Sequence, residues 1–158
     1  MNSLPILPIL ADPPELADTE GCIQCQMGSK LVLFITGNCH WQCDYCPLSE
    51  TRRDIDWMFA NERRCNSFKE VIEEAKAMNA TGAGITGGDP LMAIDRTMEG
   101  IKSLKSEFGK SFHIHMYTSI PFNPELASDF ARAGLDEIRF HFLNLNSKRY
   151  FETIEACH

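Results

Sequence analysis

Short apolar runs alternate with amphipathic stretches from Lys30 onward, and this alternation constrains the fold more than any other feature of the sequence. Four runs have the length and composition of strands, at residues 30–36, 82–86, 111–118 and 137–142. Between them, apolar residues recur at helical spacing over 67–78, 95–108 and 124–133. Strand and helix in turn predict repeated βα units around a parallel sheet. A last helix is expected to begin near Ser147.

Capping residues support two of these helices. Ser67 and Glu70 form a capping box in front of the first helix. Asn123 is suited to cap the third helix, Pro124 to begin it and Gly134 to end it.

The third and fourth strands alternate between polar and apolar residues. One face of this strand pair would carry the polar side chains of His113, His115, Tyr117, Glu137, Arg139 and His141. The apolar face is expected to pack on helices. The polar face would then line the lumen or mouth of an open barrel that holds a ligand, although any single histidine is as well explained as a hydrogen-bonded, buried side chain.

Four βα units make half of an eightfold barrel, which usually needs about 250 residues. We therefore expect an α/β fold, a partial (βα) barrel of about four units whose sheet edges are exposed. Either the chain is the N-terminal part of a longer protein, which we favour, or a partner covers those edges. Residues 1–21, rich in proline and acidic, form a leader, and residues 22–158 form the barrel part.

Composition excludes several functions. The chain of 158 residues has 15 Lys and Arg against 22 Asp and Glu, a net charge of −7, with no basic stripe that would indicate nucleic-acid binding. No apolar run approaches the roughly 20 residues that span a bilayer. The N-terminus lacks Lys and Arg before Lys30, unlike a secretory signal or a mitochondrial presequence. The cytoplasm is therefore the expected compartment.

Seven cysteines are present, and three of them follow the first strand as Cys39, Cys43 and Cys46, with the spacing C-x3-C-x2-C. In a reducing compartment such crowding favours metal ligation over disulfides. A structural zinc ion and an iron-sulfur cubane each normally take four protein ligands. Three thiolates on one cubane leave one iron open to a substrate or cofactor.

This loop resembles that of the radical S-adenosylmethionine (SAM) superfamily, whose pattern C-x3-C-x-aromatic-C is matched by Cys39, Cys43, Tyr45 and Cys46. A second family motif, Gly-Gly-Glu-Pro after the second strand, is matched by residues 87–90, with Asp89 in place of Glu. The ending CDYCP resembles the branch of the pyruvate formate-lyase activating enzymes.

The resemblance implies a 4Fe-4S cluster on Cys39, Cys43 and Cys46, with SAM bound at the open iron. Reduction would cleave SAM to a 5'-deoxyadenosyl radical that abstracts hydrogen from a substrate the sequence does not reveal. Tyr45 would pack beside the adenine, and the backbone of Gly87 and Gly88 would approach the methionine ammonium. Further SAM-binding candidates are Asp89, Thr118 and Ser119, and Arg139 and His141 are candidates for SAM or substrate.

Three interpretations stay open. Cys22 and Cys25 could hold a second metal, completed by Cys65, Cys157 or His158, or could be a redox pair or two structural thiols. The pairs Arg52-Arg53 and Arg63-Arg64 could steer an acidic reductant such as a flavodoxin or ferredoxin, or form a solvated face. The alternative to a radical SAM enzyme is a non-catalytic iron-sulfur or zinc module that holds structure or carries electrons.

Overall fold

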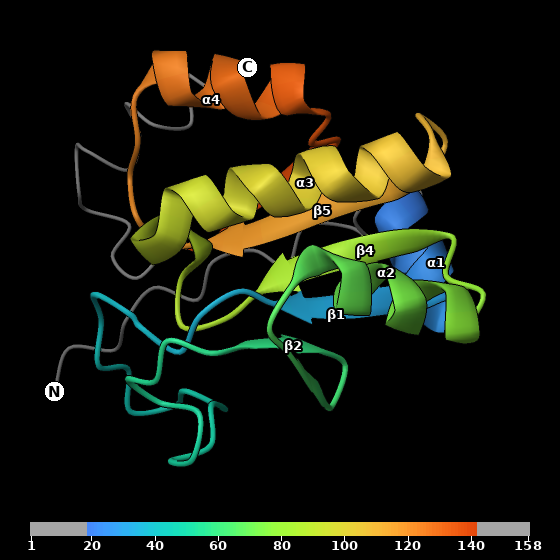
Figure 1. Ribbon diagram of the computed structural model, residues 1–158. Coiled ribbons are helices and arrows are strands. Elements are labelled where there is room, and N and C mark those ends of the chain that lie inside the picture. The colour runs from blue at the N-terminus through green and yellow to red at the C-terminus, as the bar shows by residue number, and fades with distance from the viewer. Residues whose placement is uncertain (1–18, 142–158) are drawn as a thin grey trace, which may run out of the picture.

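The computed structural model describes residues 19–141 as a six-stranded sheet with helices on both faces (Figure 1). The strands are β1 (Lys30–Phe34), β2 (Met58–Ala60), β3 (Arg63–Cys65), β4 (Gly82–Thr86), β5 (His113–Thr118) and β6 (Glu137–Phe140). The helical segments are α1 (Glu20–Gln26), α2 (Phe68–Ala77), the 3-10 turn η1 (Pro90–Ala93), α3 (Ile94–Phe108) and α4 (Pro124–Ala133). Most of the predicted leader, the helix expected near Ser147, Cys157 and His158 lie outside the described residues.

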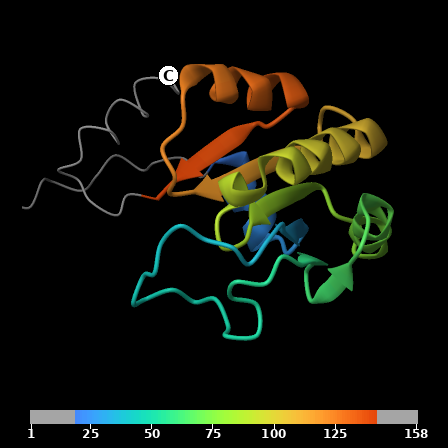
Figure 2. The same ribbon diagram turned by 60° about the vertical axis from the view of Figure 1, so that its left-hand side comes forward.

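The parallel part of the sheet confirms the predicted βα repeat. β1, β4, β5 and β6 are parallel neighbours in chain order. Helices α2, α3 and α4 cover one face of the sheet (Figures 1 and 2). The predicted caps form, since the Ser67 side chain accepts a hydrogen bond from the Glu70 amide and the Asn123 side chain one from the Leu126 amide. Gly134 ends α4 with φ +107°, in the left-handed region.

The core lies between the sheet and these three helices. Ile114 and Met116, on the apolar face of β5, are fully buried there, as the alternation of this strand predicts. Further fully buried residues come from the neighbouring strands and helices: Leu31, Leu33, Ile35, Ile85, Ile101, Leu104 and Phe130. The helical face of the sheet is thus the face that holds the fold together.

One edge of the sheet differs from the expectation. We predicted a sheet of four parallel strands with exposed edges, but β2 and β3 form an antiparallel hairpin that pairs with β1 and covers that edge. Each hairpin strand has only three residues, and Asn61 in the turn has φ +53°. Such short strands carry no recognisable alternation, so the hairpin was missed.

The second difference is α1, which begins at Glu20 within the predicted leader. It lies on the face of the sheet opposite to α2, α3 and α4 and contacts β1, β4 and β5 (Figure 1). The predicted polar face is therefore not open at this end, and His115 is only 2% exposed. A seven-residue helix with Gly21 in its first turn is marginal alone, so its packing on the sheet must stabilise it.

Candidate functional site

The three cysteines of the C-x3-C-x2-C pattern lie in the long loop of residues 35–57, which leaves the carboxyl end of β1 and leads to β2. Figure 2 shows this loop, in cyan and blue-green, extending past the carboxyl ends of the parallel strands. Cys39, Cys43 and Cys46 are partly exposed free thiols. All three sulfur atoms come from one short segment, so one loop conformation positions the whole set.

The loop backbone already supports these thiols. The Trp41 amide donates a hydrogen bond to Cys39 Sγ at 3.4 Å, and the Cys46 amide donates to the Cys43 carbonyl at 3.0 Å. Burial raises the pKa of the Cys39 thiol, and the nearby Asp89, Cys43 and Cys46 add to this rise. A metal cluster bound here would favour the thiolate form of Cys39.

The number and kind of the ligands bear on which metal centre the loop could hold. A structural zinc ion normally takes four protein ligands, whereas three thiolates on an iron-sulfur cubane leave one iron open to a small ligand. The three thiols of this loop therefore fit a 4Fe-4S cluster with one open iron.

The base of the cysteine loop is closed by polar contacts at both of its ends. Thr36 Oγ1 donates to Asp56 Oδ1 at 2.8 Å, and the Gly37 amide donates to the Ile55 carbonyl at 2.8 Å. The guanidinium of Arg96, on α3, donates hydrogen bonds of 2.6 and 2.9 Å to the two carboxylate oxygens of Asp56. It also donates to the Ile35 carbonyl. These contacts hold the start and end of the loop together, and the sequence analysis did not find them.

Arg96→Ala is expected to loosen this base and shorten the lifetime of a bound cluster. The guanidinium is about one-third exposed, so the loss in global stability should be only about 1 kcal/mol. The rate at which reconstituted protein loses iron to a chelator should rise severalfold. Arg132→Ala removes an exposed ion pair on α4 and serves as control. Equal rates of iron loss in both variants would contradict the role given to Arg96.

The glycine motif after β4 packs directly against the cysteine loop. The Gly88 amide donates to the Thr36 carbonyl at 2.7 Å, and the Asp89 amide donates to the Asn38 carbonyl at 2.9 Å. A Cβ atom on Gly88 would lie 2.2 Å from the Asn38 carbonyl oxygen, and one on Gly87 would lie 2.5 Å from the Thr36 carbonyl oxygen. Only glycine allows the two backbones to approach this closely.

Asp89 is buried, and its carboxylate binds groups of the protein itself. Oδ1 accepts hydrogen bonds from the Leu91 amide at 3.0 Å and from Thr118 Oγ1 at 2.8 Å. Oδ2 accepts from the Ser119 amide at 2.8 Å and from Ser119 Oγ at 3.2 Å. Three residues predicted to bind SAM thus meet in one network, which joins the ends of β4 and β5 beside the cysteine loop.

Asp89→Ala is expected to destabilise the chain even without iron or SAM. The change leaves several buried donors without an acceptor, which should cost about 3 kcal/mol of the free energy of unfolding. Urea denaturation of the iron-free protein measures this cost. Asp95→Ala, on the exposed surface of α3, should change stability by about 0.5 kcal/mol or less. If Asp89→Ala lowered the free energy of unfolding as little as Asp95→Ala does, the hydrogen-bond network of Asp89 would not stabilise the fold.

The other residues predicted to bind SAM or substrate, Tyr45, His141 and Arg139, lie outside the Asp89 network. Tyr45 is exposed, and its hydroxyl shares a hydrogen bond of 3.3 Å with His141 Nε2, which joins the cysteine loop to the end of β6. Arg139 lies deeper on the strand face, where its Nη1 donates to the Tyr117 hydroxyl at 2.6 Å and its Nε donates to Glu137 Oε1 at 2.6 Å. His141 is therefore close to the cysteine loop, whereas Arg139 is bound by its strand neighbours.

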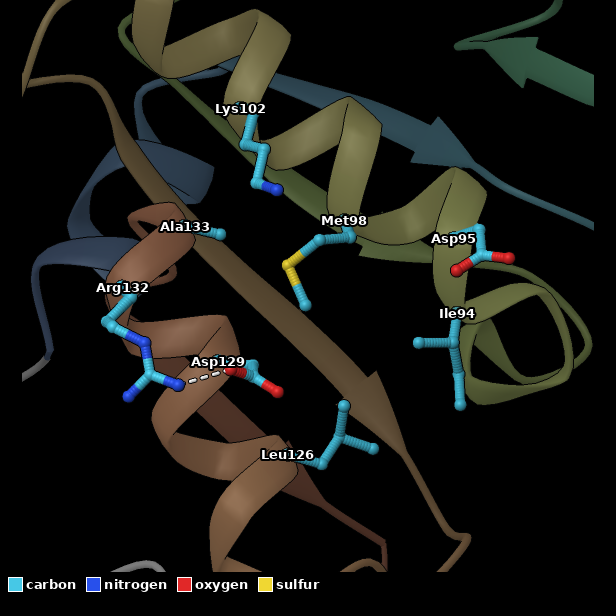
Figure 3. Close-up of a pocket in the computed structure, with 8 residues that line it drawn as sticks. All are labelled: Ile94, Asp95, Met98, Lys102, Leu126, Asp129, Arg132 and Ala133. Carbon is cyan, nitrogen blue, oxygen red and sulfur yellow. Dashed lines mark hydrogen bonds and ion pairs between the residues drawn. The ribbon is translucent and has the colours of Figure 1, made fainter.

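Two of the cavities lined by the described residues lie at different places in the fold. One, of about 530 Å³, lies beside the cysteine loop and is lined by Cys46, Phe34, Thr86 and Gly87 among others. The other, of about 370 Å³, lies in the groove between α3 and α4, where Met98 and Leu126 face each other (Figure 3). Of these two, the first adjoins the cysteine loop, so it is the candidate space for a bound cofactor.

Within residues 19–141, Cys65 does not complete the second metal site considered for Cys22 and Cys25, and the other candidate ligands, Cys157 and His158, lie outside the described residues. Cys65 is buried in the core against α2, away from α1. Cys22 and Cys25 lie on α1, and Cys22 Sγ is 3.5 Å from Arg139 Nη2. Neither Cys22 nor Cys25 belongs to the one group of potential ligands within residues 19–141 whose atoms all lie within 4.8 Å of one another.

The basic pairs near the hairpin mostly bind the protein itself. Arg52 pairs with Glu62 and Arg63 with Glu73. The Arg64 guanidinium lies 3.8 Å from the centre of the Trp57 ring. These contacts favour the interpretation of the arginines as part of the solvated surface.

Comparison with known proteins identifies the family to which the chain belongs. The family model of the radical SAM superfamily matches residues 33–155, which is most of the chain. The chain belongs to the radical SAM superfamily. It is also 49% identical over 134 residues to a protein of Methanocaldococcus jannaschii named as a glycyl-radical enzyme activating enzyme. That match covers 84% of this chain but only 36% of the relative, so the chain spans about a third of the relative's length.

Other comparisons add little about this radical SAM chain. No solved structure matches it. Within residues 19–141, none of the helices has the length and apolar character needed to cross a membrane. The family assignment therefore depends on the sequence match, and the geometry of the loop, the glycine motif and the sheet agrees with it.

Proposed function

We propose that this chain forms the cluster-binding and SAM-binding part of a radical SAM enzyme. The observation that carries the proposal is the contact between two motifs, because the glycine motif after β4 is hydrogen-bonded to the loop that holds Cys39, Cys43 and Cys46. When bound, the reduced 4Fe-4S cluster supplies the electron that cleaves SAM to methionine and a 5'-deoxyadenosyl radical, which takes hydrogen from the substrate. A low-potential reductant such as a flavodoxin or ferredoxin provides that electron.

The chain's own residues would bind and orient the cofactors. Cys39, Cys43 and Cys46 would hold three irons as thiolates and leave the fourth iron open. SAM would lie in the cavity beside Cys46, where the backbone of Gly87 limits the space at the end of β4. The side chain of Asp89 keeps this edge rigid through Thr118 and Ser119 rather than reaching into the cavity. Tyr45 and His141 would border the adenine side.

For the substrate, we propose a glycine residue of a partner enzyme. The support is the 49% identity to a relative that is named as an activating enzyme of glycyl-radical enzymes. In that reaction the radical would remove one hydrogen atom from a glycine Cα and leave 5'-deoxyadenosine as product. The chain matches about a third of that relative, so turnover with a partner is expected to be weak from the present residues alone, because a half barrel leaves the radical open to water.

The test is anaerobic reconstitution with iron and sulfide, followed by reduction with dithionite in the presence of SAM. We expect about four irons and four sulfides per chain and formation of 5'-deoxyadenosine without any partner. A preparation that binds one zinc ion and no sulfide, or a cluster with no SAM cleavage, would instead favour the structural or electron-carrying module. Removal of iron with a chelator should stop product formation.

A further inference from the structure

A second group of potential ligands lies at the other end of the strands from the cysteine loop. His113 and His115 are on β5, and Glu137 begins β6, where it is the register partner of His115. All three belong to the sheet face that α1 covers. Gly21 of α1 packs onto the group, because a Cβ atom there would lie 3.1 Å from both Glu137 Oε2 and His113 Cε1.

The ligand atoms of this group converge tightly. One ring nitrogen from each histidine and one carboxylate oxygen of Glu137 all lie within 4.8 Å of one another. His113 Nε2 is 3.6 Å from Glu137 Oε2, which is too long for a hydrogen bond but suits two atoms that share one ion. Among residues 19–141, this is the one group of three or more such side chains that meets so closely.

Two atoms of the group are buried without a hydrogen-bond partner from the described residues, His115 Nδ1 and Glu137 Oε2. His115 itself is only 2% exposed. Arg139 Nε binds Glu137 Oε1, so the carboxylate keeps its second oxygen directed at the histidines. Buried polar atoms normally have partners, and a cation between these atoms would satisfy both at once.

The neighbouring charges decide how an ion would be held. Lys30 Nζ lies 2.7 Å from His113 Nδ1, and Arg139 is paired with Glu137. Lys30 thus binds one ring nitrogen of His113 and leaves the other, Nε2, on the side of Glu137 and available to an ion. The partners on the far side of His113 and Glu137 would orient the ligands, as outer contacts do in zinc sites.

We propose that His113, His115 and Glu137 bind one divalent transition-metal ion of the zinc type. Two imidazoles and one carboxylate are a donor set that zinc accepts, with the fourth position left to water. The ion would fix β5 to β6 beneath α1 and is independent of the radical chemistry proposed above. The thiols of Cys22 and Cys25 lie outside this group.

The test uses the chain with Cys39, Cys43 and Cys46 all changed to alanine, so that failure of the proposed cluster cannot affect the result. Titration with Co²⁺ should give one equivalent with visible ligand-field bands and without the intense thiolate absorption of a cysteine ligand. Zn²⁺ should displace the Co²⁺ and raise the thermal transition of the protein.

Glu137→Gln and His115→Gln, added to that background, should each weaken Co²⁺ binding at least about tenfold. Glu99→Gln, on the exposed face of α3, should leave it unchanged. Circular dichroism of the metal-free variants checks folding, and the near-isosteric Glu137→Gln keeps the test informative if His115→Gln unfolds. Absence of stoichiometric binding, a thiolate band, or binding undiminished in the folded Glu137→Gln variant would each overturn the proposal.

Discussion

Cys39→Ala is expected to abolish cluster binding while the chain stays folded. In the proposed site three thiolates from one loop would hold three irons, and the loss of one would leave two ligands for a cubane that needs at least three. Iron and sulfide after reconstitution should fall at least about tenfold, and Cys43→Ala and Cys46→Ala should behave alike. The cysteines are partly exposed, so removing one thiol should cost little stability.

Cys25→Ala is the matched control for this prediction, because Cys25 is an exposed thiol on α1. It should keep the full iron content. If Cys25→Ala lost the cluster as Cys39→Ala does, Cys25 would be a fourth cysteine ligand. No open iron would then remain, and the electron-carrying alternative would replace the radical SAM proposal.

Gly88→Ala has the second large expected effect, and it concerns the protein without any cofactor. The added Cβ would lie 2.2 Å from the Asn38 carbonyl oxygen and 2.6 Å from the Gly37 carbonyl oxygen. Both are backbone atoms that cannot rotate away, so the loop and the β4 end must separate. We expect a loss of about 3 kcal/mol in the free energy of unfolding of the iron-free chain, measured by urea denaturation.

Gly109→Ala separates this packing effect from backbone strain. Gly109 has φ +82° and ψ −177°, a backbone region that is essentially restricted to glycine, and a Cβ atom there would meet nothing within 4 Å, so alanine should cost about 2 kcal/mol through its backbone conformation alone. If Gly88→Ala kept the stability of the parent chain and lost only SAM binding, the glycine would serve the cofactor directly and the packing explanation would be wrong.

Local signals in the sequence were enough to predict the four parallel strands and the helices α2, α3 and α4 that cover one face of the sheet. Ser67, Asn123 and Gly134 mark helix ends through contacts within a few residues, so they can be recognised without the fold. The hairpin of β2 and β3 and the helix α1 were missed for the opposite reason. Each is short, and each is stabilised by the sheet on which it packs.

The candidate site likewise combines features that local sequence predicts with features that depend on the fold. The cysteine spacing and the glycine motif are local patterns, so the sequence was sufficient to predict both. The network of Asp89 with Thr118 and Ser119 joins residues about 30 positions apart, and the sequence showed the three residues without showing that they bind one another. Likewise, the polar face of β5 and β6 was predicted, but its register, which places His115 beside Glu137, depends on strand pairing.

The central claim is that Cys39, Cys43 and Cys46 hold a 4Fe-4S cluster with one iron open to SAM. Electron paramagnetic resonance of the reconstituted and reduced chain, recorded with and without SAM, tests it most directly. The account predicts a reduced-cluster signal that changes when SAM is added and is absent in Cys39→Ala, Cys43→Ala and Cys46→Ala. A signal that is unaffected by SAM, or that survives the loss of one of these cysteines, would contradict it.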